Sequence, residues 1–129
     1  MIGAMPECRL VRGGTAFQGK QGLDYFAGIS AETSGSKQIC LHLLEMPPGA
    51  ISRPHYHVAH ETAILLLEGV VEMRHGDGLG ELMRIEAGDF VYIPPGVPHQ
   101  PFNSTDTVAR AVIARTDPNE QESVVLLDD

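Results

Sequence analysis

The chain has 129 residues, of which 43% are hydrophobic and 20% charged, a composition typical of soluble globular proteins and unlike that of disordered chains. Nine basic residues against 17 acidic ones give a net charge of -8, which disfavours binding to nucleic acid or to an anionic membrane surface. At this length we expect a single domain over residues 1–129, with a core at about residues 38–115 and strand extensions at both ends.

The sequence contains no stretch that is apolar for long enough to span a membrane. Its longest apolar run, Ala63–Leu67, is far shorter than the about 20 residues that a membrane-spanning helix needs. The segment Met1–Leu10 lacks the basic and then apolar order of a secretion signal. From these two features we expect a cytoplasmic location. Cys8 and Cys40 do not form a Cys-x-x-Cys pair, so we expect free thiols.

Glycine and proline interrupt the chain so often that few segments are long enough for a helix. The 14 glycines and nine prolines leave room for many strands of about five or six residues, which favours an all-β fold, a barrel or a sandwich. Turn signals such as Pro47-Pro48-Gly49 and Pro94-Pro95-Gly96 separate the expected strands. In chain order, the runs with strand character are Leu23–Ile29, Gln38–Met46, Glu61–Leu67, Val70–His75, Glu81–Ile85, Asp89–Ile93 and Val108–Arg115.

The segment His55–Glu68 also fits a helix, because it contains no glycine or proline over 14 residues. In a helix His55 and His57 would point in almost opposite directions. In a strand they point to the same side. The preceding Pro54 and the turns on both sides favour the strand.

Histidines gather in two places along the chain. Two imidazoles at a period of two on a strand can point into one cavity, where each buried nitrogen left without a partner would cost roughly 1–3 kcal/mol. A shared divalent cation would satisfy several of them at once. The two remaining histidines, His42 and His75, are interpreted as ordinary core or surface residues. The clustered residues are His55, His57, His60, Glu61 and His99.

Glycines and prolines at fixed distances complete two motifs around these residues. One motif is Gly, five residues, His-x-His, three or four residues, Glu, six residues, Gly. The other is Gly, five residues, Pro-x-Gly, two residues, His, three residues, Asn. The first motif is followed closely by Gly49, His55, His57, Glu61 and Gly69. The second motif is met without deviation by Gly88, Pro94, Gly96, His99 and Asn103.

With both motifs in order, residues 38–115 resemble the cupins. The resemblance implies an all-β, single-domain β-barrel of the double-stranded β-helix or jelly-roll type. It also implies that His55, His57, Glu61 and His99 hold a metal ion. We expect Asn103 to stabilise a turn, because Asn side chains readily bond to nearby backbone.

One spacing departs from the first motif, because seven residues and not six separate Glu61 from Gly69. If six residues preceded Gly69, as in the motif, the position of the motif's glutamate would be that of Thr62. In a regular strand the inward set would include His60 and Thr62, and His60 would then replace or accompany Glu61 at the metal. A one-residue bulge after Glu61 would restore the family arrangement, and we favour Glu61 over His60.

Imidazoles with at most one carboxylate suit one divalent transition metal per chain, namely iron, manganese, nickel, copper or zinc, and the sequence does not distinguish these ions. Arg53 and Tyr56 flank the ligands and are candidates for lining a substrate pocket. The guanidinium of Arg53 would suit a carboxylate substrate. We identify no catalytic acid or base besides the ligands themselves.

The resemblance favours a metal-dependent enzyme, an oxygenase, isomerase or lyase, that acts on a small organic molecule. The alternative is a non-catalytic module that binds or senses a small molecule or the metal. We expect a homodimer, because small cupins often pair their barrels. The apolar strip Val124–Leu127 needs a partner surface, either in its own barrel or in another subunit. We expect neither nucleic acid nor a membrane as a partner.

Overall fold

A computed structural model describes residues 5–13, 16–119 and 123–127. Regular structure in these residues is almost entirely β-strand, which confirms the all-β prediction. The elements are β1 (Ala16–Gln18), β2 (Asp24–Ile29), α1 (Ala31–Ser34), β3 (Cys40–Met46), β4 (His55–Tyr56), β5 (Thr62–Glu68), β6 (Val70–His75), the 3-10 turn η1 (Asp77–Leu79), β7 (Glu81–Glu86), β8 (Phe90–Ile93), β9 (His99–Phe102), β10 (Ala109–Arg115) and β11 (Val125–Leu126).

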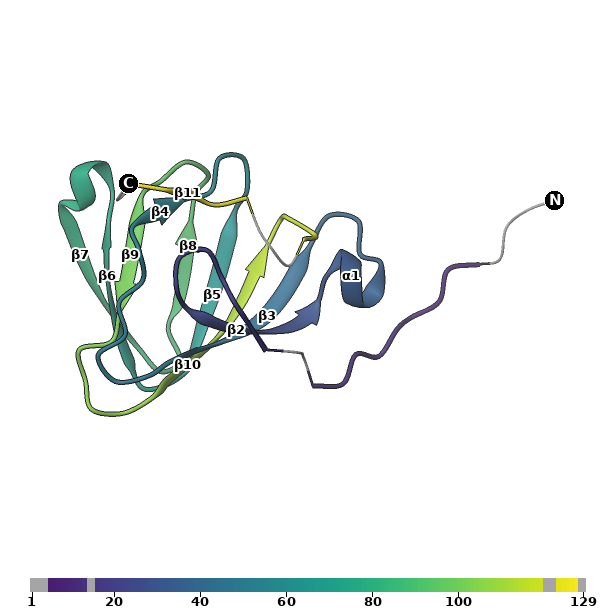
Figure 1. Cartoon of the computed structure of the whole chain (residues 1–129), viewed down its shortest axis with the longest axis horizontal. Coiled ribbons are helices and arrows are strands. Elements are labelled where there is room, and N and C mark those ends of the chain that lie inside the picture. Colours follow the sequence, from purple (N-terminus) through teal and green to yellow (C-terminus); the bar gives the residue numbers. More distant parts are fainter. Residues whose placement is uncertain (1–4, 14–15, 120–122, 128–129) are drawn as a thin grey trace.

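The strands form two antiparallel sheets (Figure 1). The six-stranded sheet has the order β1-β2-β3-β10-β5-β8, and the five-stranded sheet has the order β11-β4-β9-β6-β7. Within the described residues no strand of one sheet pairs with a strand of the other, so the sheets are not closed. The expected β-barrel type is therefore built here from two sheets, and the outermost strands of each sheet remain edges.

All seven expected runs are strands, and their ends differ from the expected ones by no more than two residues. The alternative of a helix over His55–Glu68 is wrong, since this stretch contains β4 and β5. Four short strands were not expected as separate runs. They are β1, β4, β9 and β11, which have two to four residues each and carry little periodicity of their own. No helix in the described ranges has the length and apolarity required to cross a membrane.

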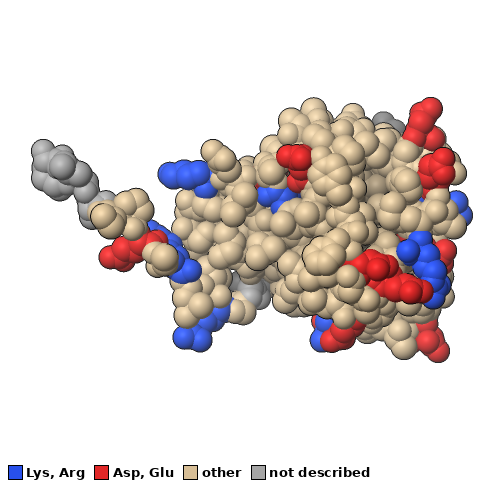
Figure 2. Space-filling model, turned by 180° about the vertical axis from the view of Figure 1, so that it is seen from behind, with Lys and Arg blue, Asp and Glu red and all other residues tan. Residues whose placement is uncertain are grey.

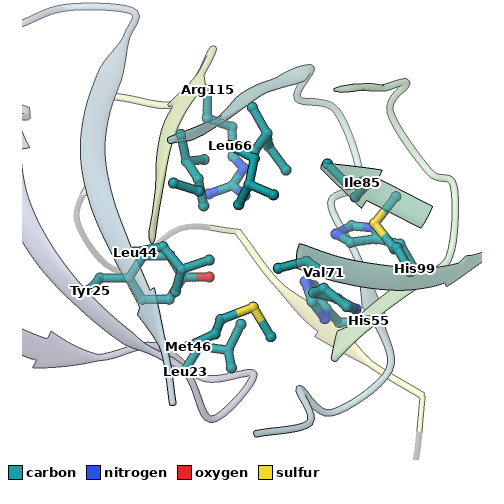
Figure 3. A pocket seen from close by; sticks show the side chains of 15 residues that line it. Leu23, Tyr25, Leu44, Met46, His55, Leu66, Val71, Ile85, His99 and Arg115 are labelled. Atoms are coloured by element: carbon teal, nitrogen blue, oxygen red, sulfur yellow. The ribbon is translucent and has the colours of Figure 1, made fainter. Parts of the chain in front are cut away.

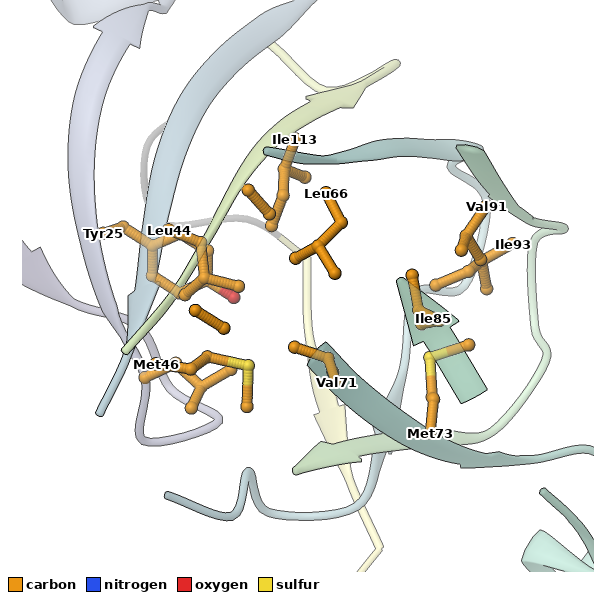
Figure 4. Packing of buried hydrophobic residues seen from close by; sticks show 13 residues of the cluster. Tyr25, Leu44, Met46, Leu66, Val71, Met73, Ile85, Val91, Ile93 and Ile113 are labelled. Carbon is orange, nitrogen blue, oxygen red and sulfur yellow. The ribbon is translucent and has the colours of Figure 1, made fainter. Parts of the chain in front are cut away.

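Side chains alternate between the space enclosed by the two sheets and the outside. In β10, Ala111 and Ile113 are buried, whereas Arg110, which comes directly before Ala111, is exposed. The inward side chains of both sheets form one hydrophobic cluster, which includes Leu66 and Met73 at 2% exposure each (Figure 4). Full burial of such a side chain contributes about 1.5–3 kcal/mol to the free energy of unfolding.

Gly69 carries the chain from β5 in one sheet to β6 in the other. Its φ of +83° lies in the left-handed region, which other residues rarely adopt. A Cβ atom at this position would also lie 2.9 Å from both the Cα of Ala109 and the carbonyl oxygen of Val108. Glycine is therefore required where the two sheets connect.

Asn103 holds the loop between β9 and β10, as expected for a turn residue. It is 1% exposed, and its Nδ2 donates to the carbonyl oxygens of Met46 and Thr107 at 2.9 and 2.8 Å. Its Oδ1 accepts hydrogen bonds from the backbone N–H and the hydroxyl of Thr105, at 3.0 and 2.7 Å. The side chain thus connects the end of β3 to this loop.

Replacing Asn103 by Ala should lower the free energy of unfolding by about 1–3 kcal/mol, because buried carbonyl groups lose their donor. Urea denaturation followed by circular dichroism measures this change. The matched control is Ser104→Ala, whose exposed hydroxyl bonds to Glu72 and whose loss should cost within about 0.5 kcal/mol. Equal effects of the two substitutions would contradict the assigned role.

Candidate metal centre

Three histidines from distant parts of the chain meet inside the molecule. His55 in β4 lies opposite His99 in β9 in the strand pairing, and His57 follows two residues after His55. All three are 2–3% exposed. Each offers a ring nitrogen, and these nitrogens lie within 4.8 Å of one another. This spacing is short enough for one ion to contact all three imidazoles.

Backbone carbonyls determine which nitrogen of each imidazole carries the proton. A carbonyl oxygen can only accept, so an Nδ1 beside it must be the protonated nitrogen, and the lone pair remains on Nε2. Histidines that bind metals usually donate their other ring N–H in this way, which fixes the ring orientation. The bonds are His55 to Arg53 at 2.7 Å, His57 to Ser123 at 3.0 Å and His99 to Val97 at 3.0 Å.

Burial keeps the three imidazoles neutral. Desolvation is the largest cause in each case, and it lowers the pKa of His57 to about 2, that of His55 to about 3 and that of His99 to about 4. Positive charges on neighbouring groups lower the pKa of His55 and His57 further. At neutral pH a metal ion would therefore find three lone pairs without displacing protons.

The Nε2 of His57 is buried and has no hydrogen-bond partner among the described residues. The Nε2 of His42 likewise is buried without a hydrogen-bond partner among the described residues. Its chemistry differs, because His42 Nδ1 accepts a hydrogen bond from the backbone N–H of Gly28 at 3.3 Å. His42 Nε2 therefore carries hydrogen, and its ring meets the ring of Phe17 edge-on at 5.5 Å. At His57 the unsatisfied group is a lone pair, and a cation is what it lacks. The donor set thus fits a divalent transition metal.

Glu61 and His60 lie outside this group of three histidines. The exposed Glu61 accepts a hydrogen bond from the hydroxyl of Tyr92 at 2.8 Å. His60 Nδ1 lies 2.7 Å from the carbonyl oxygen of Thr116, and its Nε2 lies 3.6 Å from the carboxylate of Asp117. Of the four expected ligands, the structure brings together His55, His57 and His99.

Thr62 is the inward residue at the start of β5, where the family motif counted back from Gly69 has glutamate. It is 1% exposed, and its hydroxyl accepts a hydrogen bond from Nε of Arg115 at 2.8 Å. The register of β5 against β10 shifts between Leu66 and Glu68, not after Glu61. No extra residue therefore turns Glu61 inward at the histidine end of the strand.

A cavity of about 40 Å³ adjoins the histidines, and His55 and His99 form part of its wall (Figure 3). One water needs roughly 10–15 Å³, so the cavity holds about three water-sized spheres. Most of its wall is apolar, with Tyr25 and Arg115 as the other polar residues.

Arg53 and Tyr56, the expected pocket residues, do not line this cavity. Arg115 does line it, and the period-two pattern of β10 contains the signal that would have identified it. Ala111, Ile113 and Arg115 share the buried side of the strand, whereas Arg110 points outward. The sequence alone does not say that this side faces the histidines.

The C-terminal segment lies against the site. Val125 and Leu126 of β11 pair with Tyr56 and His55 of β4. The apolar strip Val124–Leu127 therefore has a partner in its own chain. The carboxylate of Asp117 accepts the backbone N–H of Ser123 at 3.0 Å, which holds the segment that offers its carbonyl to His57.

Comparison with known families agrees with this geometry. A family model described as a cupin domain matches residues 42–114, more than half of the chain. The chain belongs to the cupin family. Comparison with the curated proteins gives no match.

Solved structures share this cupin fold. An oxalate decarboxylase of Lactobacillus farciminis in a formate complex matches at 18% identity and a TM-score of 0.74, over 88% of this chain and 33% of that one. A variant of the Bacillus subtilis oxalate decarboxylase matches at 23% identity and a TM-score of 0.73, over 88% of this chain and 30% of that one. An uncharacterised Klebsiella pneumoniae protein with a double-stranded β-helix domain matches at 17% identity and a TM-score of 0.70, over 88% of this chain and 90% of that one. At these identities the likeness shows the fold alone, and this cupin spans about a third of the decarboxylases.

Because the buried histidines resist protonation, the metal-free cupin should lose stability in acid. In the unfolded chain a histidine titrates near pKa 6.5, above the values of about 2 to 4 in the folded chain. Between about pH 6.5 and pH 4 the unfolded chain therefore binds protons that the folded chain does not, and the free energy of unfolding falls as the pH falls. Each histidine contributes up to about 1.4 kcal/mol per pH unit to this fall in the free energy of unfolding.

Urea denaturation of chelator-treated protein at several pH values measures this slope. His57→Gln removes one of the three groups and should make the slope shallower by up to about 1.4 kcal/mol per pH unit. Identical slopes for the two proteins would show that His57 does not resist protonation.

Proposed function

We propose that this cupin binds one divalent transition metal through Nε2 of His55, His57 and His99. The proposal is carried by one observation, namely three neutral, buried imidazoles whose Nδ1 atoms donate to carbonyls and whose remaining nitrogens lie within 4.8 Å of one another. Three imidazoles suit zinc, copper, iron and nickel, and they suit manganese less well because manganese prefers oxygen ligands.

We further propose that the chain is a metal-dependent enzyme of the oxygenase, isomerase or lyase class that acts on a small organic molecule. The cavity beside His55 and His99 supports this proposal, because a molecule held there would lie next to the ion. A divalent ion with only three protein ligands supplies Lewis-acid chemistry to a bound oxygen atom. The fold likeness to oxalate decarboxylases is compatible with this class of substrate.

The alternative is a binding or sensing module that uses the same cavity without turnover. It is favoured by one feature, that the described lining of the cavity contains no carboxylate able to act as a general acid or base. Oxygen consumption and product formation by the iron-loaded protein, measured with small organic acids, separate the two functions. Ligand binding without turnover supports the module, and turnover supports the enzyme.

The ligand assignment predicts the metal content of variants. His55→Ala, His57→Ala and His99→Ala should each weaken metal binding by more than the about 10–100-fold that loss of a second-shell partner costs. Glu61→Ala and His60→Ala are the matched controls and should retain the metal, because their side chains bond elsewhere. Elemental analysis of the native protein and the five variants measures this. Retention by His57→Ala, or loss from Glu61→Ala, would reject the proposed ligand set.

We also propose that the cupin is a homodimer that pairs through the outer face of the six-stranded sheet. Monomers rarely expose a contiguous apolar face of this kind. A groove of about 310 Å³ runs over β5, β8 and β10 on this side. Figure 2 draws one face of the molecule, on which the charged side chains lie in small separate groups. The exposed side chains of the sheet face are Leu41 at 41%, Leu43 at 48%, Leu67 at 46%, Phe90 at 81% and Tyr92 at 59%.

Sedimentation equilibrium tests the dimer. The wild type should have about twice the 13.9 kDa mass of one chain, and Phe90→Glu should reduce it to one chain because a buried charge opposes association. Leu82→Glu is the control, since Leu82 is 50% exposed on β7 of the other sheet. A monomeric wild type, or dimeric Phe90→Glu, would exclude this interface.

A further inference from the structure

The carbonyls that hold the three imidazoles come from different distances along the chain. His55 and His99 each donate to the carbonyl of the residue two positions earlier, so the local backbone fixes these two rings. His57 donates instead to the carbonyl of Ser123, 66 residues later in the sequence. The orientation of His57 therefore depends on a distant segment that returns to the site.

The strand that carries this segment back to the site is short. β11 contains two residues, which pair with β4 at the edge of the five-stranded sheet (Figure 1). A further bond, from the N–H of Leu127 to the carbonyl oxygen of Pro54 at 2.9 Å, follows β11, whereas Ser123 precedes it. Ser123 is exposed, and a short, exposed set of backbone bonds opens easily. Ser123 therefore depends on an anchor on its other side.

Asp117 provides this anchor. Its side chain is 2% exposed, and its Oδ2 accepts the backbone N–H of Ser123 at 3.0 Å. Its Oδ1 accepts the backbone N–H and the side-chain Nδ2 of Asn119, at 3.1 and 3.0 Å. Burial alone would raise the pKa of Asp117, but these bonds hold the pKa below its ordinary value, so the group is a carboxylate at neutral pH. Hydrogen bonds to an ionised acceptor are roughly twice as strong as neutral ones.

The backbone on both sides of Asp117 is bonded to other parts of the fold. Before it, the hydroxyl of Thr116 accepts the backbone N–H of Glu61 at 2.9 Å, and the N–H of Thr116 donates to the carbonyl of Glu61 at 3.1 Å. After it, the carbonyl of Pro118 accepts the backbone N–H of Ala31 at 2.6 Å. Asp117 thus connects the end of the six-stranded sheet to the segment that lies against the other sheet.

We propose that Asp117 is a positioning residue of the metal centre, which acts through the backbone of Ser123 to keep the lone pair of His57 on Nε2. With the carbonyl of Ser123 in place, Nδ1 of His57 must carry the proton. Without it, the imidazole can place its proton on either nitrogen, and one tautomer offers the ion no lone pair at Nε2. That this lone pair serves a metal ion rests on the proposed function, but the effect of Asp117 on His57 does not.

Nuclear magnetic resonance of the isotope-labelled, chelator-treated full chain tests this effect, because the shifts of ring nitrogens distinguish a protonated nitrogen from a bare one. In the wild type all three histidines should carry the proton on Nδ1. Asp117→Ala should give His57 a mixture of both tautomers. His55 and His99 bond to local carbonyls and should stay unchanged. Asn119→Ala is the matched control and should resemble the wild type, because it removes a different bond to the same carboxylate.

Zinc binding by the same proteins, measured by competition with a chelator, shows whether this positioning affects the metal. Asp117→Ala should weaken zinc binding by about 10–100-fold, the usual effect of losing a group that orients a metal-binding histidine. Asn119→Ala should bind zinc as the wild type does. Unchanged zinc affinity in Asp117→Ala, unchanged tautomers, or equal changes at all three histidines would overturn the proposal.

A second pair of variants applies if Asp117→Ala does not fold, as judged by circular dichroism. Ser123→Pro lacks the backbone N–H that Asp117 accepts, whereas Ser123→Ala retains it. Ser123→Pro should give His57 both tautomers and weaken zinc binding by about 10–100-fold relative to Ser123→Ala. Equal results for these two variants would contradict the role of Asp117.

Metal uptake by the wild type separates this inference from the proposed function. A tautomer change confined to His57, in a chain that takes up none of zinc, copper, iron and nickel, would support the positioning of His57 by Asp117 and reject the metal centre. Zinc bound with equal affinity by the wild type and Asp117→Ala would support the metal centre and reject the role of Asp117.

Discussion

The hydrogen bond from each imidazole Nδ1 to a backbone carbonyl is the constraint on which the site depends. A free imidazole can present either nitrogen, so three unconstrained histidines would rarely present three lone pairs to one point. The carbonyls of Arg53, Val97 and Ser123 remove this freedom before any ion arrives. Because these carbonyls belong to the backbone, the preorganisation comes from the fold and needs no further side chain.

Burial gives these bonds their effect. An exposed imidazole would be partly protonated near neutral pH, whereas desolvation keeps His55, His57 and His99 neutral. The cost is a buried polar atom, Nε2 of His57, that has no hydrogen-bond partner in the described part of the chain. Such groups are retained in functional sites because a ligand relieves them.

The interior also departs from the charge arrangement that the family motif implies. A carboxylate at the fourth ligand position would have balanced part of the positive charge of a metal ion. In this cupin Thr62 occupies that position and bonds to Arg115, while Glu61 bonds to Tyr92 at the surface. The cavity wall is therefore mostly apolar, and its polar groups are the imidazoles of His55 and His99, the hydroxyl of Tyr25 and the guanidinium of Arg115.

The sequence by itself determined the seven longer strands and the first two histidines of the buried group, because both depend on local periodicity. Alternation placed β2, β3, β5, β6, β7, β8 and β10 to within two residues, and a spacing of two put His55 and His57 on one side. The motif around His99 pointed to the third histidine of this group. Counting from Gly69 also marked Thr62, but local pattern alone could not choose between a regular strand and a bulge.

Only the tertiary structure decided what each inward residue meets. The pairing of β5 with β10 joins Thr62 to Arg115, and the return of the C-terminal segment brings Ser123 to His57. The sequence could not predict the open sheet edges either, because closure of a sheet depends on contacts between strands far apart in the chain. Periodicity reports the side of a strand on which a residue lies, and only the packing of distant strands decides which groups share that side.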